Sequence, residues 1–113
     1  MTPALVSAVS GMRDASLRLD VAAHNIANTS TADFVPLRVD SADVAGGGVT
    51  STVSASVPQA SSYPPLSSGT DLAGELISLV VARVAFAASA AMEIRNVADL
   101  YTDLGSILHI VGA

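Results

Sequence analysis

A seven-residue repeat of apolar positions runs through the first quarter of the sequence. Large residues fill one position and alanines fill the position three residues later: Leu5, Met12, Leu19 and Ile26, with Ala8, Ala15 and Ala22. This alternation predicts a helix over residues 1–28, with Pro3 in its first turn. An ordinary amphipathic helix of a small bundle would show a similar stripe, but the small alanines favour a closely packed, coiled-coil-like neighbour.

Short polar segments replace the helical pattern after this helix. Residues 28–31 are cap and turn formers, and Pro36 prevents a helix from continuing. Apolar and polar residues then alternate over residues 35–40 and again over 49–57, on either side of three glycines at 46–48. The pattern predicts a β-hairpin or extended segment that packs on a helix. A Pro- and Ser-rich stretch over 58–69 predicts an extended connector.

Helical spacing returns in the last third of the chain. We expect a second long helix over residues 70–111, with Thr70 as its N-cap and Asp71 in its first turn. Apolar positions follow steps of four and three, interrupted by one extra step of four that locally unwinds a supercoil. They are Leu72, Leu76, Leu79, Phe86 and Ala90, with Arg83 in the series, then Ile94, Val97, Tyr101, Leu104 and Leu108.

The two helices differ in their expected lengths. The second would span about 60 Å and the first about 39 Å, so the second must extend past the first. We predict one mainly α-helical domain in which the terminal helices form a coiled-coil-like antiparallel hairpin. In this interpretation Leu5, Met12, Leu19 and Ile26 pack against Leu76, Leu79, Phe86 and Ile94.

Composition and charge exclude several classes of function. The net charge is −5 and the five basic residues, all arginines, are not clustered, which argues against nucleic acid and anionic membrane surfaces as partners. The absence of cysteine excludes disulfides and thiolate metal sites. The most apolar stretch contains Arg83, so we expect no membrane insertion. The first residues do not resemble a cleaved signal peptide.

No catalytic or cofactor-binding pattern is found in the sequence. The serines lack a nucleophile-elbow motif, and the three glycines lack the lysine of a phosphate-binding loop. His24 and His109 are a conceivable pH switch or ligand pair, but their positions are more typical of surface histidines, and no metal-ligand spacing is present. We expect no enzyme activity, no metal and no cofactor.

Two stretches resemble the family of flagellar basal-body rod, hook and hook-associated axial proteins. The N-terminal one, residues 4–28, leads into the family's motif at Asn25, Ile26, Ala27, Asn28, Thr31 and Phe34. Ala32 and Asp33 stand where the family usually has Pro-Gly. The C-terminal one, residues 71–86, is similar to the family's last helix, although Arg83, Val84 and Phe86 replace its usual Gln, Arg and Tyr.

The resemblance implies a structural subunit of the flagellar basal-body rod that self-assembles through its terminal helices. It implies a homo-oligomer, other rod and hook proteins and the flagellar export apparatus as partners. It also implies export without signal cleavage to the periplasmic rod. Thin Ala-rich helices agree with this, since they need neighbours. A soluble helical adaptor or an export chaperone is the alternative. The expected assembly residues are the seam positions of both helices, including Val97, Tyr101, Leu104 and Leu108.

Overall fold

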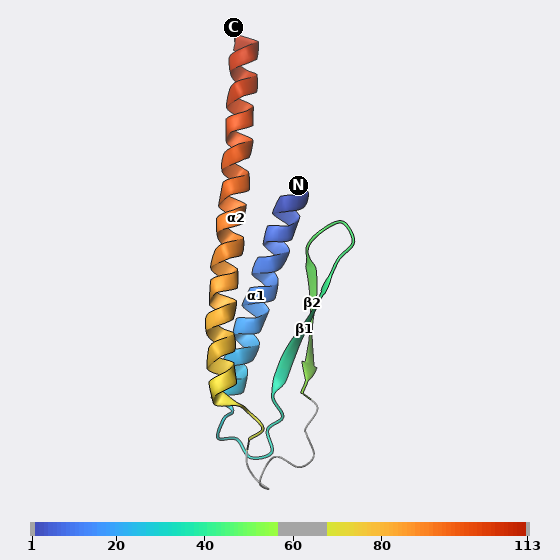
Figure 1. The fold of residues 1–113 in the computed structure, drawn as a ribbon, viewed down its shortest axis with the longest axis vertical. Coiled ribbons are helices and arrows are strands. Elements are labelled where there is room, and N and C mark those ends of the chain that lie inside the picture. The colour runs from blue at the N-terminus through green and yellow to red at the C-terminus, as the bar shows by residue number, and fades with distance from the viewer. Residues whose placement is uncertain (1, 57–67, 113) are drawn as a thin grey trace.

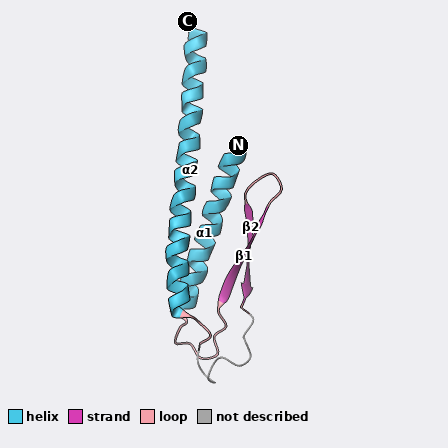
Figure 2. Cartoon of the chain, in the orientation of Figure 1, coloured by secondary structure: helices cyan, strands magenta, loops and turns pink. Residues whose placement is uncertain are grey.

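The computed structural model describes residues 2–56 and 68–112, which form two helices and one β-hairpin. Their order is α1 (Pro3–Ala27), β1 (Leu37–Asp43), β2 (Val49–Ala55) and α2 (Leu72–Gly112). Figure 1 shows α1 and α2 side by side, with the start of α1 and the end of α2 pointing the same way. The predicted fold class, two long terminal helices with a small hairpin between them, is confirmed (Figure 2).

Local sequence signals set both ends of α1. The Thr2 side chain caps the helix by accepting a hydrogen bond from the Leu5 N–H at 3.2 Å, and Pro3 follows it in the first turn. Pro fits there because its missing N–H would have no partner in the helix. At the other end, the Asn28 N–H donates to the Asn25 carbonyl at 3.2 Å. The helix therefore ends where the run of turn-forming residues begins.

The start of α2 differs from the prediction by two residues. The helix begins at Leu72, directly after Asp71, whose carbonyl accepts a hydrogen bond from the Glu75 N–H at 2.9 Å. Thr70 is not the cap that the sequence suggested. Its hydroxyl donates to the Asn25 carbonyl of α1 at 3.2 Å and ties the two helices together.

The hairpin pairs β1 and β2 antiparallel, from Leu37 opposite Ala55 to Asp43 opposite Val49. Its tip requires glycines, because Gly46, Gly47 and Gly48 all have positive φ angles of 88° to 106°. Of the predicted strand positions, Val35 precedes β1, and residue 57 lies outside the described residues. Residues 58–67 of the expected connector also lie outside the described residues.

The elements form three thin layers with α1 in the middle. The hairpin packs on α1 and makes no close backbone approach to α2, which lies along another side of α1. The molecule measures 77 × 25 × 14 Å. Its long dimension comes from α2, which extends well beyond the start of α1 (Figure 1). The last turns of α2 therefore have no partner within the described chain.

Candidate assembly surface

Small residues form the contact between the two helices. Ala8, Ala15 and Ala22 of α1 are buried, and Ala82 is the buried residue of α2. Gly11 lies so close to α2 that an added Cβ would be 2.8 Å from the Ser89 hydroxyl. The alanine positions of the repeat thus face α2 directly, as close helix approach requires.

The large seam residues lie at the edges of this contact or outside it. Leu5, Met12, Leu19, Ile26 and Leu79 are half-buried. The prediction that Leu76 and Ile94 pack against α1 is wrong for the single subunit, since they are 51 % and 70 % exposed. Leu76 and Ile94 are 18 residues apart, which is five helical turns, so they share one side of α2, about 120° around the helix from the side that Ala82 buries against α1.

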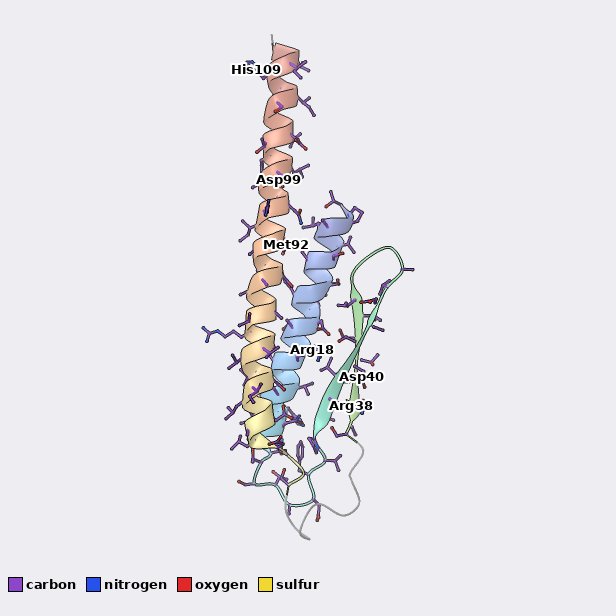
Figure 3. All side chains as sticks on the ribbon, viewed as in Figure 1. Arg18, Arg38, Asp40, Met92, Asp99 and His109 are labelled. Atoms are coloured by element: carbon purple, nitrogen blue, oxygen red, sulfur yellow. The ribbon has the colours of Figure 1, made fainter. Side chains whose placement is uncertain are left out.

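The remaining predicted assembly residues of α2 are exposed in the described chain. They are Phe86, Val97, Tyr101, Leu104 and Leu108, with exposed fractions from 36 % to 72 %. Figure 3 places Asp99 and His109 on the same projecting part of α2. Their role in contacts between subunits stays a prediction, because a single chain contains no such contact.

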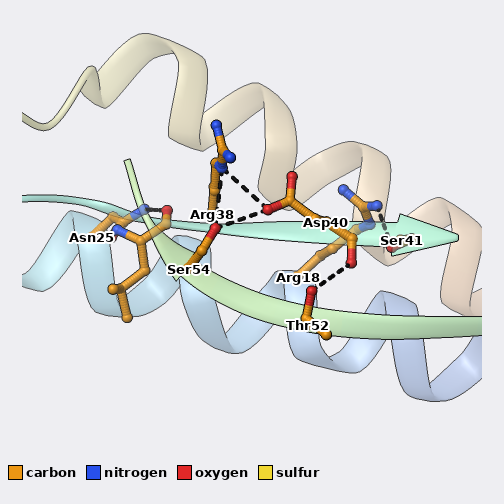
Figure 4. Close-up of polar contacts among 8 residues, drawn as sticks. Arg18, Asn25, Arg38, Asp40, Ser41, Thr52 and Ser54 are labelled. Atoms are coloured by element: carbon orange, nitrogen blue, oxygen red, sulfur yellow. Dashed lines mark hydrogen bonds and ion pairs between the residues drawn. The ribbon is translucent and has the colours of Figure 1, made fainter. Parts of the chain in front are cut away.

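A second, polar face of α1 carries the hairpin. Asp14 accepts hydrogen bonds from the hydroxyl of Ser41 on β1 and, at 2.6 Å, from that of Ser51 on β2. Arg18 donates to Asp14 at 2.9 Å. It also donates to Ser41 at 2.7 Å (Figure 4). Nearer the tip, the Ser10 hydroxyl accepts from the Val49 N–H at 3.1 Å. The hairpin is therefore held by a polar stripe.

The electrostatics of this stripe centre on Asp14. Partial burial acts to raise the pKa of its carboxyl, but the hydrogen bonds from Ser41, Ser51 and Arg18, together with the Arg18 charge, outweigh it. The pKa therefore lies below its ordinary value of 3.8. Folding and ionisation of Asp14 consequently favour each other.

Asn25 joins three elements at the base of the molecule. Its side chain is fully buried, and its amide forms two 2.8 Å hydrogen bonds with the backbone N–H and C=O of Leu37 on β1. The same amide nitrogen donates to the Glu75 carboxylate in the first turn of α2 at 2.7 Å. Figure 4 shows the Asn25 amide meeting the start of β1. The Asn25 amide pairs with the Leu37 N–H and C=O as the backbone of a neighbouring strand would, so it fixes the start of β1 against the end of α1.

The rest of the Asn-rich motif completes the end of α1. The Asn28 amide donates to the His24 carbonyl at 2.9 Å, and its oxygen accepts from the Thr31 hydroxyl at 3.1 Å. Phe34 packs on the His24 ring with centroids 5.5 Å apart. These contacts satisfy backbone groups where the helix stops, which is a structural task.

The outer strand face holds only an exposed charge pair. Arg38 donates to Asp40 at 3.2 Å and to Ser54 at 3.1 Å, with both charged side chains more than half exposed (Figure 4). Such a pair adds little stability. Among residues 2–56 and 68–112, no three His, Asp or Glu side chains lie close enough to hold a metal ion. No arrangement of catalytic groups stands out in this part of the chain.

The α2 helix also has the length and composition of a membrane-crossing helix. Its most apolar 18-residue window has a mean hydropathy of 1.7. A helix that is apolar on most sides is usually buried in a larger protein or in lipid. The described chain buries little of α2, so most of the apolar surface of this helix is exposed to solvent in the single chain.

Comparison with known proteins identifies the first part of the chain. A family model described as flagella basal body rod protein matches residues 5–34. A search of curated proteins finds no match. The matched segment contains the alanine seam, the polar stripe and the whole Asn-rich motif. This segment, 30 of the 113 residues, is similar to flagellar basal body rod proteins.

Proposed function

We propose that this protein is a self-assembling subunit of the flagellar basal-body rod, joined to its neighbours through α2. The observation that carries the proposal is the apolar part of α2 beyond α1. Leu104, Ile107, Leu108 and Val111 all lie there and are 48–79 % exposed. A soluble subunit that keeps such a surface in water loses the free energy that burial would supply, which is about 25 cal/mol per Å².

The size of the exposed surface supports more than one neighbour. The accessible surface is 7742 Å². A compact globular chain of 11.3 kDa would expose only about 5,700 Å². The excess of roughly 2,000 Å² exceeds the ~800 Å² that each partner contributes to a standard interface. Two contacts per subunit would cover it, as in an open chain of subunits.

The finer features follow from the family. Other rod and hook proteins are the proposed neighbours at each end of such a chain of subunits. Delivery by the flagellar export apparatus, without a cleaved signal, to the periplasmic rod completes the proposal.

The test compares Leu104→Asp with Leu19→Asp. Wild type should sediment as larger species as its concentration rises, with helix content by circular dichroism rising in parallel. Leu104→Asp should remain monomeric with a nearly unchanged spectrum, since Leu104 touches no other element in the subunit. Leu19→Asp, in the half-buried α1 seam, should instead lower the stability of the monomer. A fully helical, sharply melting monomer at all concentrations would favour the adaptor or chaperone alternative.

The hydropathy of α2 favours one second candidate, a membrane-crossing anchor. Against it, α2 carries Arg83 within its apolar half and Asp99, Asp103 and His109 near its end. Flotation with lipid vesicles separates the two. Recovery of wild type with the vesicles, in a carbonate-resistant form, would support the anchor and contradict the rod subunit.

A further inference from the structure

One edge of the hairpin, the side of β2 that faces away from β1, presents unpaired backbone groups. The Val44 N–H donates to the Gly48 carbonyl at 3.0 Å, and the Ser56 N–H donates to the Pro36 carbonyl at 2.8 Å. The strand register is continuous between these two bonds. Because bonded and non-bonded pairs alternate in an antiparallel ladder, the even-numbered residues of β2 bond to β1. The backbone groups of the odd-numbered residues therefore point to the outer edge. These residues are Val49, Ser51, Val53 and Ala55.

The α1 helix covers only one end of this edge. Near the hairpin tip, the Ser10 hydroxyl accepts a hydrogen bond from the Val49 N–H at 3.1 Å. At the base, α1 lies against the opposite edge of the hairpin, where Asn25 binds the N–H and C=O of Leu37 on β1. The helix therefore crosses the hairpin diagonally and leaves the β2 edge around Val53 uncovered. The Val53 side chain is accordingly 44 % exposed.

No other described part of the chain occupies the rest of this edge. Among residues 2–56 and 68–112, the edge-facing backbone groups of Ser51, Val53 and Ala55 have no hydrogen-bond partner. The trough beside α2 is lined by residues of β1 and by none of β2, so α2 does not cover the edge either. An open strand edge of this kind is a template on which another strand can pair.

The sequence of β2 lacks the features that usually prevent such pairing. Residues 49–55 contain no charged residue, no proline and no glycine, and no charge lies between Asp43 and Asp71. Natural edge strands commonly carry charges or proline, which block the approach of a second strand. In contrast to β2, the other strand of the hairpin contains Arg38, Asp40 and Asp43. The unprotected strand is therefore the one whose edge is open.

The residues on the two sides of Val53 match one another. Counted outward from Val53, Thr52 corresponds to Ser54, and Ser51 corresponds to Ala55. In an antiparallel pair of two β2 strands centred on Val53, these residues lie opposite one another. Small side chains then meet small side chains at every level, and Val53 meets its own copy, which is a favourable β-branched pair. This match within one strand points to a second copy of β2 as the occupant of the edge.

We infer that the β2 edges of two copies pair antiparallel around Val53 and join the two hairpins into one four-stranded sheet. Each Val53 N–H donates to the Val53 carbonyl of the other copy, and Ser51 and Ala55 exchange hydrogen bonds in the same way. The two hairpins then lie two strand spacings apart. Both α1 helices fit on one face of the sheet at about 10 Å, which is an ordinary helix spacing.

This contact does not rest on the proposed function and differs from the contacts proposed there. A two-fold contact closes on itself, so it joins two free subunits and does not extend into an open chain. It is also small, because three residues of each strand bury much less than the ~800 Å² per partner of a standard interface. Free subunits therefore pair transiently, and a covalent cross-link is needed to capture the pair.

The test uses disulfide cross-linking, since the protein has no cysteine of its own. All variants carry Leu104→Asp, which removes the proposed contact through α2. Thr52→Cys is mixed with Ser54→Cys and oxidised mildly, because these positions lie opposite one another with Cα atoms about 4.5 Å apart. Thr50→Cys replaces Thr52→Cys as the control, since it lies on the same face of β2 but two residues out of register. We expect the mixed 52–54 product to exceed the control product and both self-linked products at least fivefold.

A second pair of variants changes the centre of the contact. Val53→Lys in both partners should lower the yield of the 52–54 product at least fivefold, because two like charges then lie directly opposite one another. Val53→Thr, which keeps a β-branched side chain, should leave the yield within twofold. Equal yields for Val53→Lys and Val53→Thr would overturn the inference.

Three further outcomes would overturn the inference. Self-linked Thr52→Cys as the main product would indicate parallel strands, and equal yields with the control would indicate random collision. Slow hydrogen exchange of the Val53 amide in the dilute chain would mean that the chain's own residues cover the edge. Since every measurement is made with Leu104→Asp, each of these failures leaves the proposed contact through α2 standing.

Discussion

Asn25 shows how one side chain sets the relation between three elements. Because its amide is fully buried, the residue cannot contact a neighbouring subunit as the molecule stands. Its hydrogen bonds instead join the end of α1, the start of β1 and the first turn of α2. The Asn-rich motif, which lies in the segment matched by the family model, therefore contains a junction of the chain's own fold.

Loss of the Asn25 amide should destabilise the fold strongly. Asn25→Ala leaves the Leu37 backbone groups and the Glu75 carboxylate without this partner, and each unsatisfied buried group costs about 1–3 kcal/mol. We expect a loss of about 3 kcal/mol in the free energy of unfolding, measured by urea denaturation. Asn28→Ala, at the exposed end of α1, should cost about 1 kcal/mol.

Introducing a charge at Asn25 tests the same hydrogen bonds with a side chain of nearly the same size. Asn25→Asp places a carboxylate against Glu75 and the Leu37 carbonyl, so it should destabilise the fold as well. Adding Glu75→Gln should recover part of the loss, because the new amide can donate to Asp. A double-mutant cycle without coupling would contradict the hydrogen bond.

Asp14 should make stability depend on pH in the acid range. Its pKa is lowered in the folded protein, so its contribution is complete above the ordinary value of 3.8 and disappears as pH falls through the lower, folded value. We expect the stability difference between wild type and Asp14→Asn to shrink below pH ~4. Ser51→Ala should weaken this pH dependence, whereas Ser16→Ala on the exposed side of α1 should not. If the free energy of unfolding fell in parallel with pH for wild type and Asp14→Asn, Asp14 would not contribute to the pH dependence of stability.

At the scale of elements, the hairpin rests on α1 through polar contacts and glycines. A Cβ at Gly48 would lie 2.5 Å from the Ser10 hydroxyl, whereas a Cβ at Gly46 would meet nothing within 4 Å. Both glycines have positive φ, at which other residues are strained by roughly 1–2 kcal/mol. The difference between the two positions therefore isolates the docking contact.

Gly48→Ala should destabilise the protein more than Gly46→Ala. Backbone strain lowers the stability of both variants, but in Gly48→Ala the added methyl group also pushes the Ser10 hydroxyl away from the Val49 N–H. We expect a larger loss in the free energy of unfolding for Gly48→Ala and a change in the NMR signal of the Val49 amide in that variant alone. Equal losses, with an unchanged Val49 signal, would mean that the tip does not press on α1.

At the scale of the whole molecule, the subunit is a thin antiparallel pair with one long bare helix. Alanines allow the helices to approach closely, but each buries little apolar surface. The single chain therefore has only a small core, and most of α2 is exposed. In the proposed function, neighbouring subunits would supply the burial that the single fold lacks.

The sequence by itself determined the local structure. Helix spacing, Pro3 in the first turn, the turn-forming run after Ala27 and the glycines at 46–48 each act over a few residues, so the sequence alone predicted them. The family motif was also readable, because its residues are close together. The greater length of α2 followed from counting its residues alone.

Only the tertiary structure decided which side of each helix meets which partner. The sequence did not show that the polar side of α1 carries the hairpin, because nothing local distinguishes a serine facing water from one facing a strand. Leu76 and Ile94 were placed in the seam, but both lie about 120° around α2 from Ala82, and only the packing of α1 shows that Ala82 marks the covered side. The Asn25 side chain joins residues that are far apart in sequence. Thr70, which was expected to cap α2, instead donates its hydroxyl hydrogen bond to the Asn25 carbonyl. Such choices depend on distances through space, which periodicity does not encode.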